Sequence, residues 1–455
     1  MELPNYFLAD LPPEAEMTPA LVHEACGTLR RNRERYLLPR PTAAIVDTLD
    51  ALAREWRRPG YRFREVALER GPEATGFSRA TIESGLDAFF SVITARNLQA
   101  LVSQDLGHLQ RLDQLVSSEA EQFLGLAAHA RGPGLVGHIA GGVLPSPLFT
   151  GLILGLLARS AQFVKCPAGG AFLPRLLAHS LHEVEPKLAA CLELASWRGG
   201  TNSLDDSLLA AVDALTVTGT DAAVTAIRAR APARVRVLAY GHQVSLGYAA
   251  RESLTPSHAP ALAARFAHDV ADWDQLGCLS PHAIYCETGG ALTPEQFAAE
   301  LASALAAVEL DRPRGPLSPE HAADIVRRRE VYEIRAAYSE DTRCWFSEGS
   351  TSWSVVLEND PQWQASCLHR FVYVKAVDRP EACLRALAPL AGRVSTVALA
   401  AAGSRARDLA GEFARWGVTR ICPPGRMQHP PLTWRHDGRP SLGDLVTWTS
   451  QEMPS

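Results

Sequence analysis

Apolar side chains recur at three- and four-residue spacing through most of the first 125 residues. In ATIESGLDAFFSVITARNLQALVSQDL this spacing continues over several turns, which indicates amphipathic helices with one face against a core. Ser78 stands just before this run and is predicted to cap the N-terminus of its first helix. The pattern therefore predicts an almost wholly helical segment from 15 to about 125.

From Gly134 onward, short apolar runs alternate with helical patterns such as PRLLAHSLHEV. The runs are LVGHIA, AQFVKC, DALTVTG and RVRVLAY. Runs without a polar face indicate strands that are covered on both sides, as in a mostly parallel, doubly wound sheet. Such sheets bind ligands at the carboxyl ends of their strands, so the middle third is a candidate nucleotide-binding domain.

A second α/β block is predicted farther along the chain. Helices should begin at Thr293-Pro-Glu-Gln and at Ser318-Pro-Glu, where a capping residue precedes a proline. The runs AIYCE, SWSVVLE, FVYVKAV and VSTVALA have the composition of strands. The proline- and glycine-rich tail GRMQHPPLTWRHDGRPSLGDLV predicts an ordered loop that follows the surface.

The most apolar stretch runs from Gly134 to Ala158, but Gly-Gly and Pro-x-Pro interrupt it. We therefore expect a buried strand, a turn and a buried helix rather than a membrane span. The acidic N-terminus lacks the basic and apolar regions of a signal peptide. Nine cysteines without a CxxC pair indicate reduced thiols in a cytoplasmic protein and no zinc or other metal site.

Size and charge narrow the picture further. A chain of 455 residues suggests two or three domains. A formal net charge of −5 gives no reason to expect nucleic acid or an anionic membrane as a partner. The chain has no GxxxxGK[ST] or GxSxG motif, and its GxGxxG match at residues 132–137 leads into the apolar run LVGHIA rather than from a strand into a helix, so a bound dinucleotide would need another route.

Cys278 is the candidate nucleophile. Gly277 and Ser280-Pro281 flank it and favour a tight turn in which the Cys278 backbone N–H could face a bound carbonyl and stabilise an oxyanion. A thiolate is a strong nucleophile even at low population. The local sequence taken alone favours the alternative, a buried structural cysteine.

Two further motifs stand at predicted strand ends. Lys165 ends the run AQFVK, where it could contact a ribose or phosphate or simply be solvated. Thr218, Gly219 and Thr220 follow the strand LTV and precede a helical run. Their helix start could meet a phosphate, although a plain turn has the same sequence.

Taken in order, these motifs resemble the aldehyde dehydrogenase superfamily. They are VGHIAGGVLP (136–145), FVKCPAG (163–169), VTGT (217–220), YGHQVS (240–245) and QLGC (275–278). GCLSPHAIY, YGHQVSLGY, TGFSRATIESGLD and GRMQHPPLTWRHDG are similar to the LuxC-type acyl-CoA reductase branch. This likeness extends over nearly the whole chain.

The resemblance implies an α/β, aldehyde dehydrogenase-like fold. A Rossmann-like cofactor domain would have a mainly helical part at 1–125 and a dinucleotide-binding parallel sheet at 126–251. A second α/β catalytic domain would comprise 252–418 and carry the nucleophilic cysteine. The segment 419–455 would return to the cofactor domain or to an oligomer interface.

The resemblance also implies roles for individual residues. Cys278 would be the nucleophile, with its backbone N–H in the oxyanion hole. Lys165 would contact the adenosine ribose or its 2′-phosphate, and the Thr218–Thr220 motif would lie near the pyrophosphate through Gly219 and Thr220. Gly241, with His242 beside it, would lie near the nicotinamide.

Three positions depart from the wider superfamily. Ala239 replaces a water-activating glutamate, so a thioester intermediate should hydrolyse slowly. Ala168 replaces a ribose-binding glutamate, which favours NADPH over NADH. Val143 replaces the asparagine that donates to the oxyanion, a loss worth on the order of 10²–10³ in rate. His242 and Gln275 are the substitutes considered for it.

The resulting hypothesis is NADPH-dependent reduction of an acyl-CoA or acyl-carrier thioester to an aldehyde through an S-acyl-Cys278 intermediate. The superfamily implies a homodimer or homotetramer, and an acyl-transferring protein is a candidate partner. The alternatives are a cysteine-dependent acyltransferase or thioesterase without hydride transfer, and a non-catalytic acyl-protein scaffold.

Overall fold

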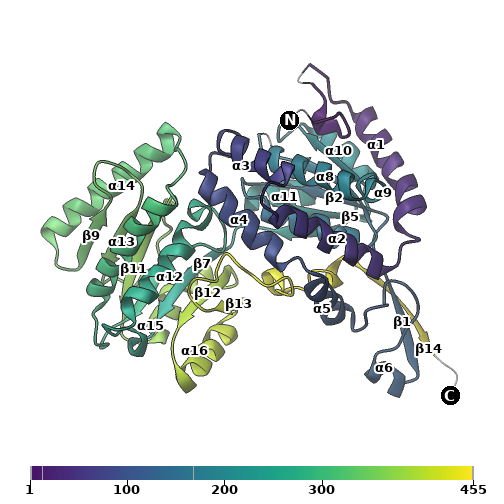
Figure 1. Ribbon diagram of the computed structural model, residues 1–455. Coiled ribbons are helices and arrows are strands. Elements are labelled where there is room, and N and C mark those ends of the chain that lie inside the picture. The colour runs from purple at the N-terminus through teal and green to yellow at the C-terminus, as the bar shows by residue number, and fades with distance from the viewer. Residues whose placement is uncertain (1–2, 13, 168, 453–455) are drawn as a thin grey trace. The chain divides into compact units, whose positions relative to one another are not determined.

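Two separate β-sheets organise the chain in the computed structural model, which describes residues 3–12, 14–167 and 169–452 (Figure 1). Each sheet belongs to its own compact unit. The first unit comprises the residues up to Thr75, Leu86–His242 and the residues from Pro431 onward. The second unit comprises Gly76–Gly85 and Gln243–Pro430.

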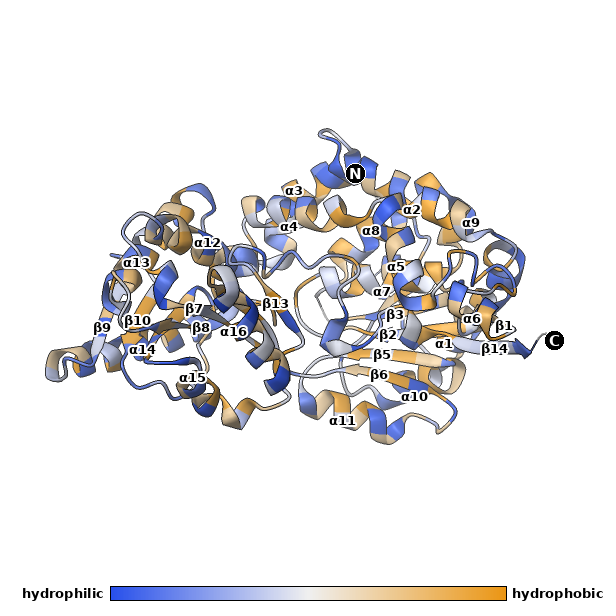
Figure 2. Cartoon of the chain, turned by 90° about the horizontal axis from the view of Figure 1, so that it is seen from below, coloured by the Kyte–Doolittle hydropathy of each residue, from blue (hydrophilic) through white to orange (hydrophobic). Residues whose placement is uncertain are grey.

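The sheet of the first unit has five parallel strands in the order β4-β3-β2-β5-β6. Every residue of the two central strands β2 and β3 is buried, and the strands β5 and β6 are largely hydrophobic (Figure 2). The four apolar runs predicted as strands are confirmed. The strands are β2 (Leu135–Ile139), β3 (Ala161–Cys166), β4 (Leu192–Ser196), β5 (Ala214–Thr218) and β6 (Arg236–Tyr240).

Helices cover both faces of this sheet. On one face the strands pack in a common apolar core with α1 (Pro19–Asn32), α10 (Asn202–Ala211) and α11 (Asp221–Arg230). The other helices that contact the strands are α7 (Ser146–Leu157) and α8 (Phe172–Val184), and these pack with α2 (Thr42–Arg57). The doubly wound arrangement predicted for the middle third is therefore present.

The N-terminal part of the chain is helical, as its periodicity predicts. Besides α1 and α2 it contains α3 (Arg62–Thr75), α4 (Arg79–Val92), α5 (Ala95–Leu106) and α6 (Glu119–Phe123). The Thr81 backbone N–H donates to Ser78 Oγ at 3.2 Å, which confirms the predicted cap. The apolar stretch after Gly134 forms β2, a turn and α7. Among the described residues, no helix has the length and hydropathy needed to cross a bilayer.

The second unit is built on a seven-stranded sheet in the order β13-β12-β7-β8-β11-β10-β9. Only the edge strand β9 is antiparallel to its neighbour. The second predicted α/β block is confirmed. Its strands are β7 (Val244–Ala249), β8 (Pro281–Glu287), β9 (Thr342–Phe346), β10 (Ser354–Glu358), β11 (Phe371–Val377), β12 (Val394–Ala400) and β13 (Arg420–Cys422).

Two apolar cores cover the two faces of this second sheet. α12 (Ala259–Ala271) and α13 (Pro294–Asp311) pack on one face. α14 (Pro319–Tyr338), α15 (Pro380–Ala386) and α16 (Gly403–Trp416) supply the other. The Thr293 and Ser318 hydroxyls cap α13 and α14, as their sequences predict.

Several elements differ from the pattern that hydropathy suggests. β7 pairs with β12 and β8 of the second sheet, so the boundary between units falls at Gln243, ahead of the expected boundary at 251. β1 (Leu126–Arg131) and β14 (Thr447–Glu452) form a separate antiparallel ribbon. All six residues of β14 are exposed, so no apolar alternation marks it in the sequence.

His138 is buried in β2 and should make stability depend on pH. The Gln162 side-chain oxygen can only accept, so His138 Nε2 donates to it at 2.9 Å and Nδ1 accepts from the Thr216 hydroxyl at 2.7 Å. Burial lowers the pKa of His138 to about 4. The unfolded chain, with a histidine pKa of about 6.5, therefore binds the proton first as pH falls.

We predict that the thermal midpoint falls as pH decreases from 6.5 towards 4 and that this dependence is shallower in His138→Asn. The free energy of unfolding should fall by about 3 kcal/mol through this window, because the proton binds the unfolded chain more tightly than the buried histidine. This stability is fully present above pH 6.5. Thermal unfolding at a series of pH values measures it. Because burial also lowers the pKa of His369 to about 4, a residual slope should remain. Equal slopes in both proteins would contradict the prediction.

Candidate active site

Cys278 lies at the surface of the second unit, in a tight turn formed by residues 277–280, here called the cysteine turn. The Ser280 backbone N–H donates to the Gly277 carbonyl at 2.9 Å, as the local sequence predicts. Gly277 and Leu279 are buried on either side of the exposed cysteine. All nine cysteines lie in the described part of the chain, and the other eight are buried or half-buried. The alternative of a buried structural cysteine at 278 is therefore wrong.

Strained backbone leads into this turn. After α12 ends, Trp273, Asp274 and Gln275 have φ angles of 51°, 51° and 64°. Non-glycine residues in the left-handed region cost of the order of 1 kcal/mol or more each. Three consecutive left-handed residues persist only where contacts with the surrounding structure hold their backbone.

A second left-handed stretch, Leu368–Arg370, is bonded to the stretch Trp273–Gln275 through Arg370. Arg370 Nε and Nη2 donate to Asp274 Oδ1 at 3.1 and 2.7 Å. The Gln275 side chain donates to the Phe371 carbonyl at 2.9 Å and accepts from the Phe371 backbone N–H at 2.8 Å. Gln275 also donates to the Pro281 carbonyl at 2.8 Å. These contacts place both sides of the cysteine turn relative to β11.

Gln275 is therefore excluded as the substitute for the missing oxyanion amide. Its side chain is fully buried, and both amide hydrogens are accounted for by the two carbonyls that it contacts. Val143, to which the resemblance assigned the position of that amide, is exposed in the first unit. Ala239, to which the resemblance assigned the position of the hydrolytic glutamate, lies in β6.

Ser245 contacts the backbone of Cys278, and this contact was not predicted from the sequence. Its hydroxyl accepts from the Thr396 backbone N–H at 3.2 Å and donates to the Cys278 carbonyl at 2.7 Å. Because the Thr396 backbone N–H can only donate, the Ser245 hydroxyl proton is directed at the Cys278 carbonyl. Ser245 was visible in the motif YGHQVS, but its partner is 33 residues away in sequence. Only the pairing of β7 with β8 brings them together.

Four of the five predicted cofactor residues meet at one edge of the first sheet. Thr218 ends β5, and the Gly219 backbone N–H donates to the Tyr240 carbonyl at the end of β6, at 3.3 Å. Thr220 caps α11 through its hydroxyl. Gly241 follows β6 directly, and a Cβ there would lie 2.7 Å from Asp221 Oδ1.

Lys165 lies along the same edge, two strands away on β3. It is not the solvated lysine that one interpretation of the sequence suggested, because its side chain is buried. Its Nζ is 3.1 Å from Asp205 Oδ1, and Trp197 Nε1 donates to the same oxygen at 2.9 Å. Arg230 is 3.5 Å from the other carboxylate oxygen. Asp205 was missed because β4, which precedes its helix, gave no clear strand pattern.

This edge fits a dinucleotide. A Cβ at Gly141 would lie 2.4 Å from the Thr218 carbonyl oxygen, so only glycine allows β2 and β5 to approach so closely at their ends. Gly219 and the capped N-terminus of α11 supply small residues and oriented amides of the kind that accommodate phosphate. Ala168, from which a preference for NADPH was predicted, lies outside the described residues.

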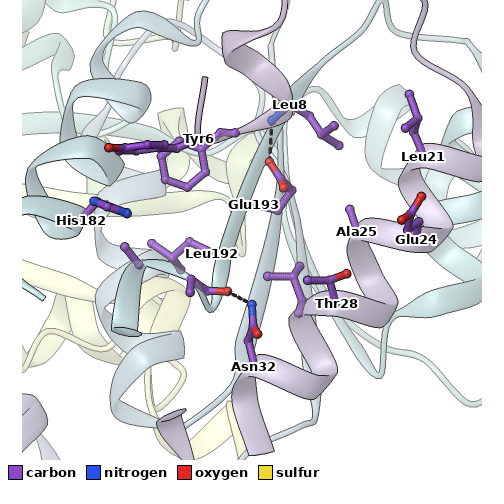
Figure 3. Close-up of a pocket in the computed structure, with 14 residues that line it drawn as sticks. Tyr6, Leu8, Leu21, Glu24, Ala25, Thr28, Asn32, His182, Leu192 and Glu193 are labelled. Carbon is purple, nitrogen blue, oxygen red and sulfur yellow. Dashed lines mark hydrogen bonds between the residues drawn. The ribbon is translucent and has the colours of Figure 1, made fainter. Parts of the chain in front are cut away.

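The first unit also contains a pocket of about 460 Å³ away from these residues (Figure 3). It lies between α1, β4 and the N-terminal segment. Glu193 accepts from the Leu8 backbone N–H at 2.7 Å, and Asn32 donates to the Ala190 carbonyl at 2.7 Å. Burial raises the pKa of Glu193 to about 7. None of the predicted site residues lines this pocket.

Comparison with known proteins places these features in a family. A family model described as acyl-CoA reductase (LuxC) matches residues 37–448. The long-chain acyl-protein thioester reductases of Vibrio harveyi and Photorhabdus luminescens are 21% and 22% identical to this chain. Each alignment covers 90% of this chain and 82% of the relative.

Solved structures share the fold. Proline Utilization A of Bradyrhizobium japonicum is 16% identical with a TM-score of 0.72, and the match covers 96% of this chain but 45% of that longer protein. An NAD-dependent benzaldehyde dehydrogenase from Corynebacterium glutamicum is 12% identical with a TM-score of 0.69, over 96% and 91% of the two chains. These likenesses confirm the predicted aldehyde dehydrogenase-like fold.

Gly85 in α4 tests the support beneath the cysteine turn. A Cβ built there lies 2.0 Å from Trp273 Cζ2, and Trp273 also packs edge-on against Phe77 with ring centroids 5.1 Å apart. We predict that Gly85→Ala lowers the free energy of unfolding by about 1–3 kcal/mol, since the indole must move. Denaturant unfolding measures this loss.

Gly27→Ala is the matched control in α1. The nearest atom to a Cβ at Gly27 is Arg31 Nη1 at 3.5 Å, so the helix-propensity gain of about 1 kcal/mol should remain. A Gly85→Ala variant as stable as the Gly27→Ala variant would contradict the proposed packing role of Trp273.

Proposed function

Because the chain belongs to the acyl-CoA reductase (LuxC) family, we propose that it reduces an acyl thioester to an aldehyde through an S-acyl intermediate on Cys278. The observation that carries this proposal is the exposed cysteine on a turn that buried side chains hold in place. The names of two relatives support a long-chain acyl group carried on a protein. Acyl-CoA is the other carrier that we propose to be accepted.

The chain's own residues account for acylation. The Cys278 thiolate attacks the thioester carbonyl, a new carbon–sulfur bond forms, and the bond to the carrier thiol breaks. The carrier leaves as a thiolate that takes up a proton. Negative charge develops on the carbonyl oxygen, and we propose that backbone N–H groups of the cysteine turn, including that of Cys278, stabilise it.

We propose NADPH as the reductant, held by Lys165, Thr218, Gly219, Thr220 and Gly241. When bound, its nicotinamide supplies the hydride that reduces the acyl carbon. The tetrahedral adduct on Cys278 then loses its bond to sulfur, which releases the aldehyde and regenerates the cysteine. Ala239 in place of a carboxylate base favours survival of the acyl-enzyme over hydrolysis, and this supports reduction over thioesterase activity.

We further propose that the protein acts as a homodimer or homotetramer and receives its acyl group from a partner protein. The oligomeric state is supported by the wider superfamily, whose members usually form dimers or tetramers. The names of the two acyl-protein thioester reductases support the second. Size-exclusion chromatography with light scattering determines the oligomeric state.

Cys278→Ala tests the nucleophile. We expect oxidation of NADPH with a panel of acyl-CoAs to fall by at least about 10³-fold, because the covalent intermediate cannot form. Absorbance of the reduced nicotinamide measures the rate. Cys344→Ala, which removes a half-buried thiol on β9, is the control and should retain activity. Reduction that persists in Cys278→Ala would overturn the assignment.

The same assay separates the alternatives. Acylation of Cys278 without oxidation of NADPH on any substrate would favour an acyltransferase. Absence of both acylation and nucleotide binding would favour a scaffold.

Ala168→Glu tests the choice of cofactor. A carboxylate there should repel the 2′-phosphate of NADPH and bind the ribose hydroxyls of NADH. We expect the ratio of kcat/KM for NADPH to that for NADH to exceed one in the natural protein and to fall at least about tenfold in the variant, equivalent to about 1.4 kcal/mol. Steady-state kinetics with both cofactors measure this ratio. A natural protein that prefers NADH would contradict the proposal.

A further inference from the structure

The chain leaves the second unit through residues 425–430, here called the return segment, which run beside the end of α12. The Gly425 and Met427 backbone N–H groups donate to the two oxygens of Asp269 at 2.6 and 2.9 Å. Arg420 donates to the carbonyls of Met427 and Arg426, each at 2.6 Å. Four hydrogen bonds, two accepted by Asp269 and two donated by Arg420, therefore fix the backbone of the return segment.

Two side chains of the return segment reach to either side of Cys278. His429 Nε2 is 3.1 Å from Asp272 Oδ2, ahead of the left-handed stretch. Gln428 Nε2 donates to Ser280 Oγ at 2.6 Å, at the last residue of the cysteine turn. The motif MQHPPL thus contacts the chain both before and after the nucleophile.

The bonds to Asp269 hold the return segment, whereas the bond from Gln428 to Ser280 holds the cysteine turn. The return segment is already fixed by its backbone, so the Gln428 bond adds little to its placement. Ser280 is 1% exposed, and its backbone N–H closes the turn that carries Cys278. A bond that holds Ser280 therefore holds the cysteine turn.

We propose that Gln428 is a positioning residue for the Cys278 thiol. Its amide fixes Ser280, and through the cysteine turn it aims the sulfur at the thioester carbon. This inference rests on the proposed function, in which Cys278 is acylated. It extends that function to a residue on the segment that leads back to the first unit.

The charge of the side chain at 428 distinguishes two roles: orienting the Cys278 sulfur and changing the pKa of its thiol. The Gln428 amide is neutral, so its loss should slow acylation without shifting the pH dependence of thiol reactivity. A carboxylate at 428 would accept from the Ser280 hydroxyl and keep the link. Its negative charge would disfavour a nearby thiolate and raise the pKa of Cys278.

The test uses the full chain with palmitoyl-CoA and follows acylation of Cys278 by mass spectrometry in single turnovers. We expect Gln428→Met to acylate about tenfold more slowly, with a KM within about twofold of the natural value, as expected for one lost hydrogen bond. Gln428→Glu should recover most of the rate at high pH. Its iodoacetamide alkylation profile should move to higher pH, while that of Gln428→Met stays in place.

Arg426→Gln is the control, since that side chain is exposed on the same segment, and it should acylate at the natural rate. Ser280→Ala provides a second approach if Gln428→Met folds poorly. It should show the same loss, and the double variant should be no slower than either single variant.

A natural acylation rate in Gln428→Met, or additive losses in the double variant, would overturn the inference while leaving the proposed function intact. A natural protein that is acylated at Cys278 neither by palmitoyl-CoA nor by a palmitoylated carrier-protein thioester would overturn both. A lower thermal midpoint in Gln428→Met with unchanged acylation would assign the contact to stability alone and would also overturn the inference.

Discussion

A single buried amide, that of Gln275, joins two stretches of left-handed backbone, and the placement of Cys278 depends on it. The side chain bonds both backbone groups of Phe371 at the start of β11 and the Pro281 carbonyl at the start of β8. It therefore links the left-handed stretch ahead of the cysteine turn to β8, the strand that follows the turn. The ion pair between Asp274 and Arg370 reinforces the same junction. Arg370 also bonds Glu309 and the Arg312 carbonyl, and Asp274 accepts from the Gly315 backbone N–H, so each charge of the pair has further partners.

This arrangement explains how an exposed thiol can be held precisely enough for chemistry. An exposed turn ordinarily has few contacts and opens easily. Here, strained backbone keeps its conformation because buried partners specify it more than once. The strain is concentrated immediately before the cysteine, and the bonds that offset it come from β7, β11 and the return segment. The cysteine turn is thus positioned by the second sheet as a whole.

Much of this fold follows from local pattern. Runs such as AQFVKC and FVYVKAV gave the central strands because burial on both faces leaves a continuous apolar signal, and Ser78, Thr293 and Ser318 marked helix starts through short-range capping. Elements whose stability comes from partners far along the chain were not predictable. β14 is polar and exposed, and it is a strand only because β1 pairs with it. The roles of Asp205, Ser245 and Gln428 likewise depend on partners that only the folded topology brings close.

With Gln275 excluded, His242 and the backbone of the cysteine turn are the remaining candidates for the oxyanion donor, and the turn is the one that the second sheet orients. Gln275 is committed to two carbonyls, and Val143 offers no amide. The Ser245 hydroxyl, oriented by the Thr396 N–H, bonds the Cys278 carbonyl and so fixes the plane of the peptide that carries the Leu279 N–H, the donor that follows the Cys278 N–H in the turn. A fixed peptide plane is what a backbone donor needs, since a preorganised N–H stabilises developing charge without reorganising. If the turn supplies this donor, a side-chain amide becomes dispensable, and valine at 143 ceases to be evidence against catalysis.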